Sequence, residues 1–285
     1  MLFDVSCELE YSVTFPSTLI LNVQAQRNAS QTVVKEQLTV APSIRFAEFT
    51  AEGSHNRFIR LETGRHKQLS VTYSATVNCD FQTYAARSVE PTPVSELSGA
   101  ELPYLFPSRY CQSDRLGKLA WDLFGSIANP HQKVVAITDW IHANVDYLRG
   151  STDSVTSAFD TVTQRTGVCR DFSHLGIALC RALNIPARYF AGYAYELEPK
   201  DFHACFECFI GGHWVVFDAT RLAHLNGLVR IGSGRDAAEA AVASIFGSAY
   251  CTRMQVDCTL GEGEKFTGLG RPQLNKRGVS LTPGA

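Results

Sequence analysis

The sequence lacks the features that mark membrane proteins and nucleic-acid-binding proteins. It has no apolar run long enough to span a bilayer. Its formal net charge of −2 gives no general attraction to anionic membranes or to nucleic acid, and no basic stretch carries interleaved aromatic residues. The first residues also lack the basic and apolar segments of a secretory signal, so we expect a cytoplasmic protein that binds neither membrane nor nucleic acid.

The nine cysteines do not indicate a disulfide framework. Their number is odd, and they are scattered along a chain of 285 residues without a secretion signal. Cys205 and Cys208 have the spacing of zinc ligands, but no second pair follows at a suitable distance. On a strand their thiols would point to opposite faces, which opposes a shared metal ion. The sequence therefore predicts no metal site and no cofactor.

The first 90 residues or so have the pattern of β-strands. Apolar residues alternate with polar ones from Phe3 to Val13, a period of two that is typical of a half-buried strand. Further strands are predicted at residues 18–23, 32–40, 43–49, 57–61 and 69–77, with turn-rich segments between them. Frequent strands without an intervening helix favour an antiparallel sandwich or barrel.

The pattern changes near Glu90-Pro91-Thr92-Pro93, which we interpret as a linker. Helical periodicity follows, and helices are predicted at residues 116–127, 131–145, 158–164, 169–183 and 237–246. Strands are predicted at residues 187–195, 203–210, 214–220 and 252–260. We therefore predict an α+β chain with a β-rich N-terminal domain (1–92), a core (93–260) and a poorly ordered C-terminal tail (261–285).

The segment Gly167-Val168-Cys169-Arg170-Asp171-Phe172 places Cys169 in the first turn of a predicted buried helix. A thiol at a helix N-terminus is a candidate nucleophile, because the helix end favours its thiolate. A single cysteine at such a position more often serves packing. The functional interpretation therefore depends on suitable partners elsewhere in the chain.

His203 and Asp218 are such partners, and the strand register tests them. If Gly211-Gly212 forms a two-residue hairpin turn, residue 206 faces 217 and residue 205 faces 218. One face of the hairpin is then wholly apolar, whereas the other carries His203, Cys205, Glu207 and Asp218. His203 and Asp218 become diagonal neighbours on that polar face, roughly 7 Å apart at Cα. A slip of one residue would separate them.

With the start of the Cys169 helix against this polar face, the three residues form a site for acyl transfer. Cys169 would be the nucleophile, His203 the general base and acid, and Asp218 the group that orients the imidazole. The backbone amide of Cys169 is a candidate donor to the oxyanion, and the second donor stays open. Three neighbouring features have simpler interpretations. Glu207 would bind substrate or be solvated, Arg170 and Asp171 would form a weak exposed ion pair, and Gly232 and Gly234 lack the context of a phosphate-binding loop.

Several motifs, in order, resemble the bacterial transglutaminase-like superfamily. They are Gly167-Val168-Cys169-Arg170-Asp171-Phe172-Ser173-His174-Leu175, Asn184-Ile185-Pro186-Ala187-Arg188-Tyr189, Asp201-Phe202-His203-Ala204, Trp214-Val215-Val216-Phe217-Asp218-Ala219-Thr220 and Gly234-Arg235-Asp236-Ala237-Ala238. The resemblance covers roughly residues 100 to 260. It implies a papain-like core with a triad of Cys169, His203 and Asp218, and the first 90 residues are similar to the β-rich domain that often precedes this core.

The resemblance does not imply protein cross-linking. Val168 and Arg170 flank the candidate nucleophile, where animal cross-linking enzymes have Gln and Trp, and no acidic cluster resembles their calcium sites. Hydrolysis of a peptide or another amide substrate through a thioester is the activity that this comparison favours. Two alternatives stay open: transfer of the acyl group to an amine, and a binding module that retains the triad without catalysis. The oligomeric state is also open.

Overall fold

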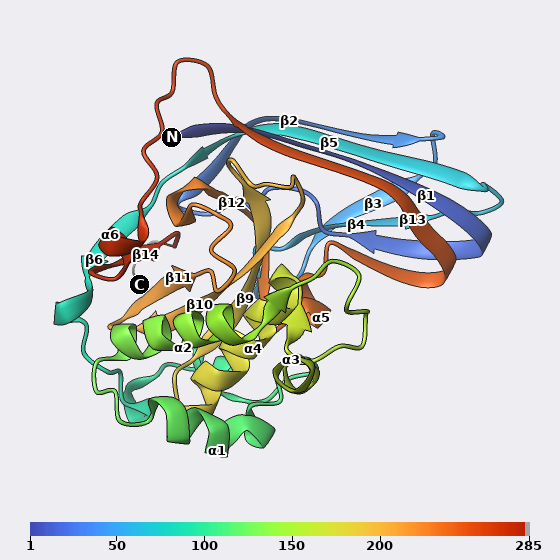
Figure 1. Ribbon diagram of the computed structural model, residues 1–285. Helices are drawn as coiled ribbons and strands as arrows, with labels where there is room; N and C mark the ends of the chain where they lie inside the picture. The colour runs from blue at the N-terminus through green and yellow to red at the C-terminus, as the bar shows by residue number, and fades with distance from the viewer. Residues whose placement is uncertain (283–285) are drawn as a thin grey trace.

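A computed structural model describes residues 1–282 of the chain (Figure 1). A curled six-stranded antiparallel sheet has β1 (Leu2–Leu21) at its centre. Along one edge β1 pairs with β13 (Ala243–Leu260), and along the other it pairs first with β5 (Gln68–Cys79) and then with β4 (Arg57–Glu62). The sheet is completed by β2 (Gln31–Ala41) beside β5 and β3 (Phe46–Thr50) beside β4.

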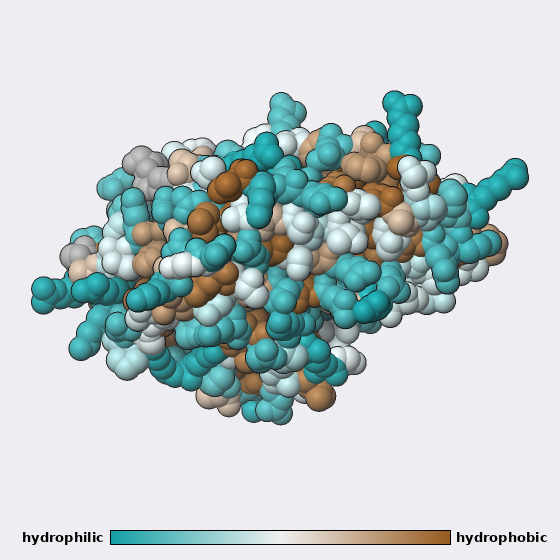
Figure 2. All heavy atoms as spheres, turned by 90° about the horizontal axis from the view of Figure 1, so that it is seen from above, coloured by the Kyte–Doolittle hydropathy of each residue, from teal (hydrophilic) through white to brown (hydrophobic). Residues whose placement is uncertain are grey.

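The predicted alternation in β1 explains how this sheet packs. Phe3, Val5, Cys7 and Leu9 are at most 2% exposed, whereas the residues between them are partly exposed. The buried face packs on the core, where the rings of Phe3 and Tyr195 lie 6.1 Å apart. Burying each large apolar side chain contributes about 1.5–3 kcal/mol. Figure 2 views the molecule from above and shows hydrophobic patches interrupted by hydrophilic side chains.

The core is a four-stranded antiparallel sheet covered on both faces. Its strand order is β11 (His213–Phe217), β10 (His203–Ile210), β9 (Ala187–Ala194) and β12 (Leu228–Gly234). One face carries α4 (Cys169–Ala182), which is surrounded by α1 (Ser113–Phe124), α2 (Pro130–Asn144) and α3 (Ala158–Gln164). The C-terminal segment, with α6 (Arg271–Leu274), lies beside β11, and its strand β14 (Arg277–Ser280) pairs with β6 (Gln82–Ala85). A short parallel pair, β7 (Asp146–Tyr147) and β8 (Thr166–Gly167), precedes α4.

The α+β class with an antiparallel N-terminal part is confirmed, and its strands form one curled sheet. The helix predicted at 237–246 is wrong beyond Ala240, because α5 (Ala237–Ala240) ends there and β13 begins at Ala243. In the tail, α6 and β14 form part of the fold, although its last three residues lie outside the described part of the chain. β12 was not predicted as a strand.

The boundaries at residues 92 and 260 stay a prediction, and β13, from the predicted core, adds to the N-terminal sheet. Among the described residues, every helix is too short or too polar to cross a bilayer.

Candidate active site

Cys169 is the first residue of α4, and its side chain is partly exposed. The pairing of β7 with β8 fixes the chain just before it. The fully buried Asp171 then holds the start of the helix, because its carboxylate accepts a hydrogen bond from the Val168 amide at 2.9 Å. The same carboxylate accepts one from the Thr152 hydroxyl at 2.8 Å. The backbone around the thiol is therefore held in place by buried polar contacts.

The prediction of a weak exposed pair between Arg170 and Asp171 is wrong. The two side chains lie 3.0 Å apart, and the side chain of Asp171 is 0% exposed. Arg170 also donates to the backbone oxygen of Asp153 at 2.6 Å. The pair therefore connects the loop before α3 to the start of α4. Loss of Arg170 would leave the buried Asp171 charge without its partner, and loss of Asp171 would weaken the hold on that loop.

The strand register predicted for the Gly211-Gly212 hairpin is confirmed, with residue 206 opposite 217 and residue 208 opposite 215. Asp218 is the first residue beyond β11, and its Oδ2 lies 2.9 Å from His203 Nε2. Its Oδ1 accepts from the amide of Thr220 at 2.8 Å and from the hydroxyl at 2.6 Å. Both side chains of the pair are almost fully buried. The imidazole orientation is thus set by a carboxylate that is itself held in place.

The helix does not lie against the face that carries His203. It packs on the apolar face, where Gly176 fits against the Phe206 ring and Cys180 Sγ lies 3.5 Å from Cys208 Sγ. A Cβ on Gly176 would come within 2.5 Å of that ring, so the close packing requires glycine there. Because His203 is the first residue of β10, its ring lies near the N-terminal end of α4, which begins at Cys169. The Cys169 thiol interacts with this imidazole and helps to raise its pKa.

The electrostatics of this group favour a charged imidazole. Burial of the His203 ring disfavours its protonated form, but the charge of Asp218 and the hydrogen bonds of the ring outweigh burial and raise its pKa well above the ordinary value. Burial likewise opposes ionisation of Asp218, yet the imidazole and Thr220 together lower the pKa of the carboxyl. The structure therefore joins His203 to Asp218 by a buried hydrogen bond, and the Cys169 thiol interacts with the same ring.

Tyr147 is a site residue that the sequence did not single out. Burial and the field of the Cys169 thiol raise the pKa of its phenol, which also interacts with the backbone of Cys169. The position is fixed, because Tyr147 pairs with Gly167 and its ring packs at 5.9 Å from Phe172. No motif marks Tyr147, since its place depends on a two-residue parallel pairing.

Glu207 differs from its simplest interpretation, whereas Cys205 lies as its strand predicts. Cys205 is fully buried beside His203 and Asp218, whereas Cys208 points to the opposite face, as the alternation predicts. The interpretation of Glu207 as a substrate-binding or solvated residue is wrong. It is fully buried and contacts Arg188 at 2.7 Å and Arg230 at 2.6 Å. The contact with Arg230 could not be anticipated, because its strand, β12, was not predicted, whereas Arg188 lies on the predicted strand β9.

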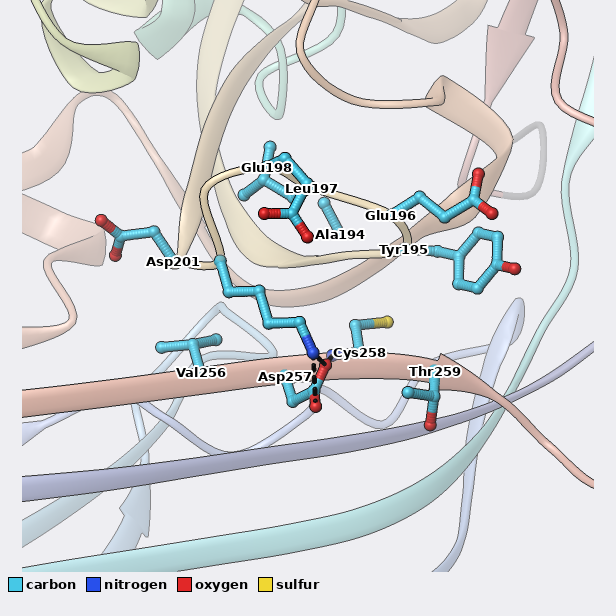
Figure 3. A pocket seen from close by; sticks show the side chains of 11 residues that line it. Ala194, Tyr195, Glu196, Leu197, Glu198, Asp201, Val256, Asp257, Cys258 and Thr259 are labelled. Atoms are coloured by element: carbon cyan, nitrogen blue, oxygen red, sulfur yellow. Dashed lines mark hydrogen bonds and ion pairs between the residues drawn. The ribbon is translucent and has the colours of Figure 1, made fainter.

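A pocket of about 190 Å³ lies beside the strand end that carries His203 (Figure 3). One wall is the loop from β9 to β10, and the other is β13 of the N-terminal sheet. Lys200, in this loop, pairs with Asp257 at 2.9 Å. Asp201, two residues before His203, lines this pocket and pairs with Arg149 at 3.2 Å. The two sheets together therefore shape the space next to the site.

Comparisons with known proteins agree with this architecture. Residues 118–219 match the transglutaminase-like superfamily, and residues 1–100 match the N-terminal domain of bacterial transglutaminases. The solved structure of a candidate cysteine protease from Cytophaga hutchinsonii is 53% identical, with a TM-score of 0.96 over 99% of this chain and 98% of that chain. An uncharacterized protein of Mycobacterium leprae is 26% identical over 251 residues, which are 79% of this chain and 86% of the relative. With this fold and this order of motifs, the chain belongs to the transglutaminase-like superfamily.

Proposed function

We propose that the protein is a cysteine peptidase or amidase that cleaves amide bonds through a thioester on Cys169. The observation that carries this proposal is the buried pair of His203 and Asp218, 2.9 Å apart, whose ring interacts with the partly exposed Cys169 thiol at the start of α4. A thiol, a base and an orienting acid in this order are the parts of nucleophilic acyl transfer. A peptide or a related amide in the cytoplasm is the proposed substrate.

The reaction proceeds in two stages. The proton of Cys169 passes to His203, which gives the charged imidazole that Asp218 favours, and the thiolate attacks the amide carbon, so that negative charge develops on the carbonyl oxygen. The Cys169 amide stabilises this charge, and the Tyr147 hydroxyl, which interacts with the Cys169 backbone, is the second donor. The carbon–nitrogen bond breaks as His203 delivers its proton to the leaving amine. Water then attacks the thioester, gives a proton to His203 and releases the acid, and the thiol is restored.

The test is to trap the thioester. We expect intact-mass spectrometry to show an acyl adduct after brief exposure to a peptide library and rapid acid quenching. Cys169→Ala should abolish the adduct while the fold persists, because the substitution removes one small group. Cys251→Ala, which removes an exposed cysteine, is the matched control and should keep the adduct. An adduct that persists in Cys169→Ala, or none in the wild type, would contradict the proposal.

The two alternatives give different results in the same preparation. Amine transfer is favoured if a labelled primary amine enters a glutamine peptide faster than free glutamate is released. A binding module without catalysis is favoured if iodoacetamide leaves Cys169 unmodified at neutral pH.

A further inference from the structure

Cys205 lies in the middle of the site without a role in the proposed reaction. It follows His203 by two residues on β10, so both side chains point to the same face of the strand. The donor atoms of His203, Cys205 and Asp218 all lie within 4.8 Å of one another. The cysteine is 0% exposed, so its thiol is packed inside the protein beside these two groups.

This set of donors is the kind that zinc binds. An imidazole nitrogen, a thiolate and a carboxylate oxygen suit a borderline-soft divalent ion. Zinc bonds to such atoms are roughly 2.0–2.3 Å long, so tetrahedral ligands lie about 3.3–3.8 Å apart. The three donors therefore need only small side-chain movements. Thr220 contacts Oδ1 of Asp218, whereas Oδ2 accepts from the Ala223 amide at 3.1 Å and faces His203, so a zinc ion on Oδ2 would take the place of the His203 contact.

We propose that His203, Cys205 and Asp218 form an inhibitory zinc site. The ion replaces the proton between His203 Nε2 and Asp218 Oδ2, and the Cys205 thiol ionises to complete the protein ligands. Two protons leave, one from the imidazolium and one from the thiol, and Zn²⁺ enters. No covalent bond of the chain breaks, and no electron is transferred.

Zinc bound in this way stops the reaction at its first step. With Nε2 coordinated, the neutral ring carries its remaining proton on Nδ1, the nitrogen left to face Cys169. The ring then cannot accept the thiol proton. The inhibition rests on the proposed function, whereas the binding of zinc does not.

The alternative location is an ion held by Cys169 and His203, a pairing that leaves Cys205 unused. Binding is therefore measured in the Cys169→Ala protein, by competition for Zn²⁺ with a chromophoric chelator. We expect one zinc per chain, and we expect Cys205→Ala in this background to weaken the affinity by at least ~100-fold. Cys208→Ala, which removes a buried thiol from the other face of the same strand, is the control and should leave the affinity unchanged.

Two further measurements keep the outcome decisive. If Cys205→Ala lowers the unfolding midpoint, Cys205→Ser replaces it, because a hydroxyl retains much of the volume but is a poor zinc ligand. In otherwise wild-type enzyme, Zn²⁺ should inhibit turnover, and Cys205→Ala should lose this inhibition relative to its own rate without zinc. Equal zinc affinity with and without Cys205, or no binding to Cys169→Ala, overturns the proposal. Zinc binding without any acyl adduct on the wild type would overturn only the proposed function.

Discussion

Two buried carboxylates lie on the same face of the core sheet and differ in their partners. Glu207, on β10, is held between Arg188 and Arg230. Asp218, just past β11, is held by His203. Both are almost fully buried, and in both the opposite charge outweighs burial, so that the pKa of Glu207 falls to about 2 and that of Asp218 also falls.

The difference between the partners separates structure from chemistry. Arginine stays charged at any pH that a protein experiences, so the Glu207 cluster cannot exchange a proton. Histidine can lose and regain its proton, and the ring of His203 also interacts with a partly exposed thiol. A buried ion pair therefore supports proton transfer only where one partner titrates and a reactive group adjoins it.

The largest expected effect is on catalysis, when the pair of His203 and Asp218 is broken. Asp218→Asn removes the charge that orients and stabilises the imidazolium, so we expect kcat to fall by about 10⁴-fold, as in related triads. Steady-state hydrolysis of a peptide found by adduct trapping measures it. Asp139→Asn, which weakens the partly exposed pairs of Asp139 with Arg221 and Arg271, is the control and should change kcat by no more than about twofold. A loss of less than tenfold in Asp218→Asn would remove Asp218 from the mechanism.

The pair of His203 and Asp218 could be predicted from the sequence because its geometry is local. A two-glycine turn and the alternation of two strands fix His203 and Asp218 on one face, whatever the rest of the chain does. The cluster around Glu207 depends on Arg230, which lies on β12, a segment distant in the sequence. The pairing of β13 with β1 and the place of Tyr147 depend on equally remote contacts, so neither could be inferred from periodicity.

The second effect is on stability, when the cluster of Glu207 with Arg188 and Arg230 is broken. Glu207→Gln leaves two buried guanidinium groups without their counter-charge, so we expect the free energy of unfolding to fall by about 3–5 kcal/mol. Urea denaturation measures the loss. Glu239→Gln, which breaks the exposed pair with Arg235, is the matched control and should cost less than about 1 kcal/mol. Equal losses in the two variants would mean that the buried cluster has no special structural weight.

A smaller effect sharpens the description of the catalytic end. Tyr147→Phe removes the hydroxyl that interacts with the Cys169 backbone, so we expect kcat to fall by about 10²-fold while KM changes little, because the lost hydrogen bond forms only in the transition state. Tyr250→Phe, at an exposed tyrosine of β13, is the control. A proportional rise in KM at constant kcat would assign Tyr147 to substrate binding instead.

The pH dependence of stability distinguishes the His203–Asp218 pair from the Glu207 cluster without any substrate. Because the pKa of His203 is raised, its contribution to stability is complete below about pH 6.5 and is lost as pH rises through the raised value. The lowered pKa of Asp218 brings a loss only at acid pH, below its ordinary value of 3.8. The stability difference between wild type and Asp218→Asn should therefore narrow as pH rises above about 6.5. The difference for Glu207→Gln should stay constant over this range, because arginine and a carboxyl with a pKa of about 2 do not titrate there. Urea unfolding of the three proteins at several pH values measures both slopes, and parallel slopes would show that the His203–Asp218 pair does not titrate as an ion pair.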